Sequence, residues 1–142
     1  EHRVAHLMRV RELAFPSFVV WTMQAETSAM ARVFAAKGIL PASAQDYLRQ
    51  VAISRIVLAA IPHVGASWPT QGEKIAQAAL AFGADDFGST MLEENVVSAA
   101  GATRTRMDAG EIRRHIRAAG FVPAQRDSRY RTIRRFAQEA AA

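Results

Sequence analysis

The sequence predicts an α/β fold in which strands and helices alternate and the strands run parallel. Three short predicted strands alternate with predicted helices, which is the pattern of consecutive βαβ units. The units recur about every 40 residues without a shared residue pattern, which favours a barrel segment over a solenoid. With 142 residues, half of them apolar, the chain can form one core, so we expect one domain or part of one.

The first part of the chain predicts a helix, a buried strand and a long connection. Glu1 to Leu13 places apolar residues at helical spacing with arginines between them. Phe15 to Trp21 is a run of aromatic and β-branched residues, which is typical of a strand. Thr22 to Ala42 shows no clean period, so we expect a loop with a short helix around Ser28 to Ala35.

The central part predicts two helices on either side of a second strand. Ser43 suits the N-cap of a helix that ends near Ala60. His63 to Trp68 is the second short strand, and Pro69 to Gly72 is expected to be a loop. Glu73 to Phe82 then has the apolar spacing of a helix.

The last part predicts one short strand and three helices. Gly83 to Asp86 is a very short strand or turn, and a loop leads from it into a helix from about Met91 to Ala100. Asp108 and Glu111 have capping-box spacing, which predicts the start of a further helix. The end of the chain, Ser128 to Ala142, is expected to be a last helix.

The densest group of polar side chains lies where the third strand passes into a helix. Ligands of α/β folds bind at this kind of junction, where strand ends meet helix N-termini. Like charges so close together raise one another's pKa, so a counter-charge or a ligand must offset them. The candidate binding residues in this group are Asp85, Asp86, Ser89, Thr90, Glu93, Glu94 and Asn95.

Three interpretations of the carboxylates in this group remain open. Each carboxylate near the helix N-terminus would stabilise the helix dipole by roughly 0.3 to 1 kcal/mol, so any one of them could be purely structural. A Mg²⁺ or Ca²⁺ site suits carboxylates, but the spacing matches no calcium loop, and we predict no metal here. Hydrogen bonds to sugar hydroxyls fit the group better.

Four further candidates lie at the ends of the first two strands. Trp21 ends the first strand, and Ser67, Trp68 and Gln71 lie at or just beyond the end of the second. If the strand ends converge, these side chains would form an aromatic and amide wall suited to a planar ring. A core or lid role is about as common for a tryptophan at such a position.

The four histidines are weaker candidates. His63 and His115 are expected to be structural. His2 and His6 lie one helical turn apart, a spacing that can bind metal. The helix lacks the Glu of the His-Glu-x-x-His metal motif, and we expect the pair to face solvent.

The net charge of +5 comes from arginines after residue 103. A solvated helix face is the favoured explanation, and nucleic acid is a disfavoured partner, because few aromatic residues lie between the arginines. The sequence has no secretory signal and no apolar run of about 18 residues. We therefore expect a cytoplasmic protein without membrane contact.

Three separated motifs carry a family resemblance that spans nearly the whole chain. They are Ala66 to Gly72, Gly83 to Gly101 and Ala119 to Tyr130. In this order they resemble the C-terminal half of the cyclic dehypoxanthinyl futalosine synthase family, which comprises radical SAM enzymes of menaquinone biosynthesis. Aminofutalosine synthase and the radical SAM subunits of deazaflavin synthesis resemble the chain less well.

The resemblance implies that residues 1 to 142 are the C-terminal part of a single radical SAM, TIM-like barrel domain. It implies S-adenosylmethionine and a [4Fe–4S] cluster as cofactors, a small-molecule substrate and an external electron donor in the complete enzyme. Because the chain has no cysteine, we expect the cluster ligands to lie in a missing N-terminal part. As an open barrel piece, the chain alone is expected to be inactive and to self-associate.

In that setting the candidate residues would contact substrate or S-adenosylmethionine. Arg126, in the downstream motif, would supply a counter-charge to the carboxylates or meet a carboxylate of the substrate. The alternative function is a stand-alone interaction or nucleic-acid-binding module that uses the arginine-rich region.

Overall fold

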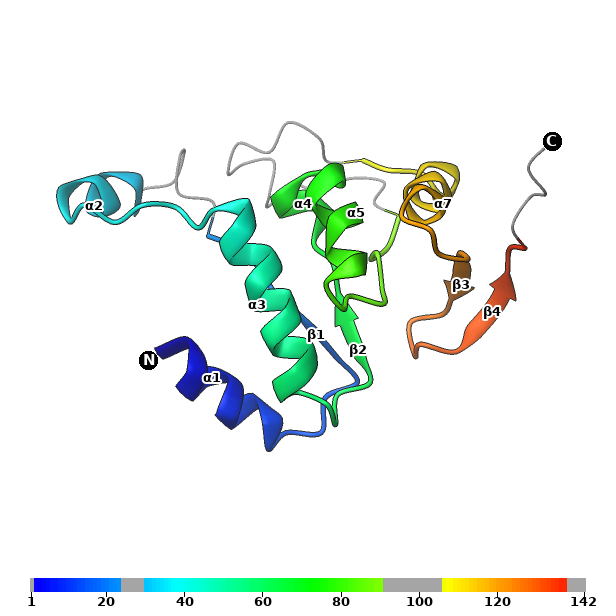
Figure 1. Ribbon diagram of the computed structural model, residues 1–142, viewed down its shortest axis with the longest axis horizontal. Helices are drawn as coiled ribbons and strands as arrows, with labels where there is room; N and C mark the ends of the chain where they lie inside the picture. Colours follow the sequence, from blue (N-terminus) through cyan, green and yellow to red (C-terminus); the bar gives the residue numbers. More distant parts are fainter. Residues whose placement is uncertain (1, 24–29, 91–105, 138–142) are drawn as a thin grey trace.

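The computed structural model describes residues 2–23, 30–90 and 106–137, which form helices together with short strands (Figure 1). The elements are α1 (His2–Arg11), β1 (Ser17–Val19), α2 (Met30–Ala36), α3 (Ala44–Val57), β2 (His63–Gly65), α4 (Trp68–Gln71), α5 (Glu73–Ala81), α7 (Ala109–Ala118), β3 (Ala124–Arg126) and β4 (Thr132–Arg135).

The predicted parallel pairing is confirmed for the first two strands. β1 and β2 run parallel, with Phe18 opposite Val64. The third strand is reduced to one parallel bridge between Gly65 and Asp86. In this bridge the Ala66 N–H donates to the Asp86 carbonyl over 2.8 Å. We call residues 83–86 the third-strand segment.

The helices cover one face of this small sheet. Phe18 and Val64 point to that face, because both pack into the hydrophobic clusters beneath the helices. Side chains alternate along a strand, so the next residues, Val19 and Gly65, lie on the opposite face. Asp86 bridges Gly65 and marks the place where the third-strand segment joins the sheet.

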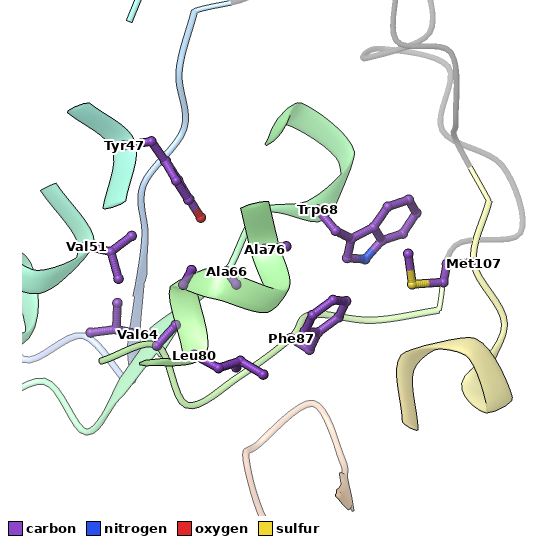
Figure 2. Close-up of a cluster of buried hydrophobic side chains, with 11 residues drawn as sticks. Tyr47, Val51, Val64, Ala66, Trp68, Ala76, Leu80, Phe87 and Met107 are labelled. Atoms are coloured by element: carbon purple, nitrogen blue, oxygen red, sulfur yellow. The ribbon is translucent and has the colours of Figure 1, made fainter. Parts of the chain in front are cut away.

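The main core forms where α3, α5 and the strands meet. Figure 2 shows this cluster, in which Trp68, Phe87 and Met107 group at one end. Its buried residues are Tyr47, Val51, Val64, Ala66, Trp68, Ala76, Ala79, Leu80, Ala84, Phe87 and Met107. A second cluster holds α1 against the end of α3 through Leu7, Val10, Leu58 and Ile61.

Both predicted helix caps are confirmed. Ser43 Oγ accepts a hydrogen bond from the Asp46 N–H, and the Asp46 carboxylate accepts one from the Ser43 N–H. Asp108 and Glu111 make the same reciprocal pair at the start of α7. These boxes satisfy N–H groups that have no partner within the helix, which explains why the helices begin there.

The predicted last helix, Ser128 to Ala142, is wrong over its described part. Residues 132–135 form β4, which pairs antiparallel with β3. Asp127 closes this hairpin, because its carboxylate accepts hydrogen bonds from the N–H groups of Arg129 and Arg131. A side chain that satisfies the backbone in this way competes with helix formation.

Two other predictions for the connecting segments have different outcomes. The loop predicted at Pro69 to Gly72 is wrong, because residues 68–71 form the short helix α4. Proline is tolerated there because the first turn of a helix needs no donor from it. The helix predicted from Met91 to Ala100 lies outside the described residues. In the described part of the chain, no helix is long and apolar enough to cross a bilayer.

Candidate functional site

A cavity of about 310 Å³ lies between the end of the third-strand segment, α7 and the β3–β4 hairpin. Its polar side is formed by Asp85, Asp86, Ser89, Thr90 and Arg126. Its apolar side includes Ile112 and Ile116 of α7 and Phe136 after β4. The cavity therefore gathers five of the predicted site residues from segments that are far apart in the sequence.

Asp86 makes an ion pair with Arg126 at this cavity. Asp86 Oδ2 accepts hydrogen bonds from Arg126 Nη2 at 2.5 Å and Nε at 3.2 Å. Asp86 Oδ1 accepts only the Gly88 N–H, at 3.2 Å, among the described contacts. The predicted counter-charge on Arg126 is thus present, and the hydrogen bonds to Asp86 raise the pKa of Arg126 above its usual value. Within the described part of the chain, one lone pair of Oδ1 is therefore left for a ligand hydroxyl.

Both carboxylate oxygens of Asp85 are held by contacts within the fold. Its Oδ1 accepts hydrogen bonds from Arg55 Nη2 at 2.5 Å and from the Val64 N–H at 2.7 Å. Its Oδ2 lies 2.8 Å from His63 Nδ1. Burial raises the pKa of Asp85, but the hydrogen bonds from Val64, His63 and Arg55 outweigh burial, so the pKa lies below its usual value. These contacts favour a structural role for Asp85.

Tyr130 links the residues that hold the two aspartates. Its ring stacks on His63, with centroids 4.2 Å apart and planes 11° apart. The Arg126 guanidinium carbon lies 4.2 Å from the same ring centroid. No role was predicted for Tyr130 or for Arg55. Arg126 lies only four positions before Tyr130, but the contacts of Tyr130 with His63 and of Arg55 with Asp85 join distant parts of the chain, and nothing local in the sequence indicates them.

The other predicted site residues of the motif Gly83 to Gly101 have separate outcomes. Ser89 and Thr90 line the cavity and are exposed to solvent. Glu93, Glu94 and Asn95 lie outside the described residues.

The predicted aromatic wall is not formed among the described residues. Trp68 is 2% exposed and belongs to the core beside Phe87 (Figure 2), so its packing role is the one the structure favours. Trp21 is 68% exposed and lines a different cavity of about 520 Å³, between α1, α3 and β1. The two tryptophans therefore do not line a common site for a planar ring.

The other predicted site residues of the motif Ala66 to Gly72, Ser67 and Gln71, are engaged in hydrogen bonds within the protein. The Ser67 N–H donates to Tyr47 Oη at 2.9 Å, and Ser67 Oγ lies 2.7 Å from Thr70 Oγ1. Gln71 Nε2 donates to Thr22 Oγ1, which joins α4 to the segment after β1. These bonds position the ends of two neighbouring strands relative to each other.

The three histidines other than His63 lie in two environments. His115 connects α5 to α7, with Nε2 at 2.5 Å from Glu73 Oε2 and Nδ1 at 3.0 Å from Gln77 Oε1. His2 and His6 are exposed beside the second cavity. Across residues 2–23, 30–90 and 106–137, no group of three His, Cys, Asp or Glu side chains could hold a metal ion.

Comparison with known proteins matches the chain over nearly its full length. The family described as the CofH/MqnC C-terminal region matches residues 12–139. The chain is 43% identical to cyclic dehypoxanthine futalosine synthase of Halalkalibacterium halodurans over 100% of the chain and 38% of that protein. It is 42% identical to the protein of the same name from Streptomyces coelicolor over 90% of the chain and 32% of that protein.

A relative named for a different activity matches as well. The chain is 37% identical to 5-amino-6-(D-ribitylamino)uracil–L-tyrosine 4-hydroxyphenyl transferase of Archaeoglobus fulgidus, over 94% of the chain and 39% of that protein. The chain thus spans between 32% and 39% of the length of these three relatives.

Proposed function

Because the chain belongs to the CofH/MqnC C-terminal region family, we propose that it is part of a radical SAM enzyme that cyclises dehypoxanthine futalosine in menaquinone biosynthesis. Two of its similar relatives are named cyclic dehypoxanthine futalosine synthase. The motifs after the second and third strands resemble that family more than they resemble aminofutalosine synthase or the radical SAM subunits of deazaflavin synthesis. The activity would belong to the complete protein, of which this chain supplies one part.

In the proposed enzyme, this chain would form the last part of a (βα) barrel. The parallel β1 and β2, and the parallel bridge from Gly65 to Asp86, support this proposal. Helices α3 and α5 cover one face of these strands, as the outer helices of a barrel do. The opposite face, with Val19 and Gly65, would then face the barrel interior.

Asp86 is the observation that carries the proposal. It lies at the carboxyl end of a parallel strand, where barrel enzymes bind ligands. Its side chain is 13% exposed, it is held by Arg126, and among the described residues Oδ1 accepts only the Gly88 N–H, at a cavity that Ser89 and Thr90 also line. A carboxylate and two hydroxyls suit the hydroxyls of a sugar, such as the ribose of the substrate or of S-adenosylmethionine.

The implied cofactors differ in how they fit this chain. A [4Fe–4S] cluster is held by thiolates. The chain contains no cysteine, so its residues do not fit the cluster. S-adenosylmethionine fits better, because its ribose matches the hydroxyl-binding groups at Asp86. When bound and reduced, it supplies the radical for the cyclisation. The residues of this chain would bind the sugar hydroxyls, orient them and exclude water.

The test uses Asp86→Asn in the complete protein. Removing the charge weakens a charge-assisted hydrogen bond, so kcat/KM for cyclised product should fall about ten- to a hundredfold. Asp108→Asn is the matched control, because it makes the same change at a helix cap outside the cavity and asparagine also caps helices. Activity of Asp86→Asn within twofold of the parent would contradict the role of Asp86.

A second variant keeps the test informative if Asp86→Asn does not fold. Ser89→Ala combined with Thr90→Ala removes two exposed hydroxyls, whose described contacts include no core residue. We expect kcat/KM to fall about three- to tenfold, with the melting temperature unchanged. A fully folded, cluster-loaded complete protein that forms no cyclised product would instead contradict the assigned reaction.

A further inference from the structure

Tyr130 has a backbone conformation that tyrosine seldom adopts. Its φ is +61°, and it is the one non-glycine residue with positive φ among residues 2–23, 30–90 and 106–137. This left-handed region is unfavourable for bulky side chains, and glycine or asparagine is the usual occupant. Such outliers persist where the surrounding structure holds them, and they cluster at functional sites.

The turn itself does not require the tyrosine ring. Asp127 closes it, because Asp127 Oδ1 accepts the N–H groups of Arg129 at 2.8 Å and Arg131 at 3.0 Å. The Asp127 N–H also donates to the Arg131 carbonyl at 3.0 Å. A glycine at position 130 would adopt the same φ without the steric cost. The reason for a tyrosine must therefore lie in the contacts of its ring.

The ring contacts connect two neighbouring carboxylates through two basic side chains. His63 stacks on Tyr130 and lies against Asp85, whereas Arg126 contacts Tyr130 and holds Asp86. Both basic side chains line the cavity. Arg126 Nη1 also donates to the Asp127 carbonyl at 3.1 Å, so the edge of the guanidinium is hydrogen-bonded and the Tyr130 ring covers its face. Without the ring, the guanidinium would lose the surface that restricts its rotation away from Asp86 Oδ2 into the cavity.

We propose that Tyr130 is a positioning residue that holds the Arg126 guanidinium on Asp86 Oδ2, so that Oδ1 is the atom presented to a ligand hydroxyl. This proposal rests on the proposed function of Asp86. The stacking of His63 on the same ring fixes the ring from the side of β2. The C-terminal hairpin thereby sets the orientation of a carboxylate that belongs to the third-strand segment.

The experiment compares Tyr130→Gly and Tyr130→Phe in the complete protein. Glycine keeps the turn and removes the ring, so kcat/KM should fall about five- to thirtyfold while the melting temperature stays within a few degrees of the parent. Phenylalanine keeps the ring face and should recover most of that loss. Arg129→Ala is the matched control, because it changes the same turn at an exposed side chain that does not line the cavity.

A double-mutant cycle separates positioning from a general structural role. If Tyr130 acts through Arg126, then Tyr130→Gly should have no further effect in an Arg126→Gln background. Effects that multiply would overturn the proposal. A Tyr130→Gly protein whose melting temperature falls while its activity stays at the parent value would also overturn the proposal.

A crystal structure of the complete Tyr130→Gly protein distinguishes failure of this proposal from failure of the proposed function. We expect the Arg126 guanidinium to have left Asp86 Oδ2. If it stays there, the positioning role is overturned, whatever the activity. If Asp86→Asn keeps full activity, the proposed function of Asp86 fails, and with it the consequence assigned to Tyr130.

Discussion

Arg55 donates a hydrogen bond to Asp85 over 2.5 Å, and this ion pair joins α3 to the third-strand segment. The same guanidinium donates to the carbonyls of Gly83 and Pro62, at 2.6 Å and 3.2 Å. Arg55 therefore binds both chain segments that lead into β2 and into the third-strand segment. Both neighbouring aspartates line the cavity, but Asp85 is the one that holds these segments together, and Asp86 is paired with Arg126 of the hairpin.

Asp85→Asn is expected to reduce stability and to leave the cavity residues in place. The variant weakens the bond from Arg55 and the contact with His63, so the free energy of unfolding should fall by about 1 to 2 kcal/mol. We take the lower part of the range for charged hydrogen bonds, because the Asp85 side chain is 40% exposed and solvent screens the pair. Calorimetry of the complete protein measures the change. Arg49→Gln, at an exposed 3.9 Å pair, should change stability by less than about 0.5 kcal/mol.

The contribution of Asp85 should depend on pH in the acid range. Its pKa is lower in the folded protein than the value of about 3.9 expected in the unfolded chain. The ionised carboxylate therefore stabilises the fold above about pH 4, and this stabilisation is lost as the pH falls through the folded-state pKa. The difference in melting temperature between the parent and Asp85→Asn should shrink from pH 6 toward pH 3. A difference that stays constant over this range would argue against an ion pair.

The sequence predicted those features that depend on neighbouring residues. Ser43 and Asp108 cap helices by bonds to residues three positions away, and both helices start where predicted. The parallel pairing of β1 with β2 followed from the alternation of strands and helices. The caps need no knowledge of distant contacts, and the parallel direction of the two strands needs only the order of the elements along the chain.

The features that the sequence could not predict depend on distant partners. Asp85 and Asp86 are adjacent and chemically identical, yet Arg55 and Arg126 give them different surroundings from 30 and 40 positions away. The hairpin at residues 124–135 was predicted in part as helix, because its composition favours a helix and only Asp127 reveals the turn. For Trp68, core packing was one of the roles left open, and the burial of the side chain decides in its favour.

Ser43→Ala tests the first helix cap. The variant removes an acceptor for the Asp46 N–H and the hydroxyl that donates to Asp46 Oδ2 at 2.8 Å. We expect the free energy of unfolding to fall by about 1 kcal/mol. Product formation at saturating substrate should not change, because Ser43 lies outside the cavity at Asp86. Ser43→Asp should retain most of the stability, since aspartate also caps helices.

His115→Leu tests the connection between α5 and α7. The side chain is 14% exposed and joins Glu73 to Gln77, and its ring stacks on Phe87 with centroids 5.7 Å apart. Its loss should lower the free energy of unfolding by about 1 to 3 kcal/mol, because partly buried acceptors lose a donor. Activity per folded molecule should be preserved. A large fall in kcat with an unchanged melting temperature would indicate a direct role of His115 in the reaction.

The chain expressed alone is expected to self-associate. In the described sheet β1 has a partner only on the β2 side, so its other edge presents unpaired backbone groups. Large apolar side chains that line the same cavity as β1 are open to solvent, among them Trp21 at 68% and Leu40 at 86% exposure. Light scattering coupled to size-exclusion chromatography should show species larger than a monomer that grow with concentration. Val19→Lys should reduce this association, because a charged residue on an edge strand opposes further pairing. A monomer with a sharp two-state unfolding transition would contradict this expectation, because the unpaired edge and exposed side chains would then be stable in water without the rest of a barrel.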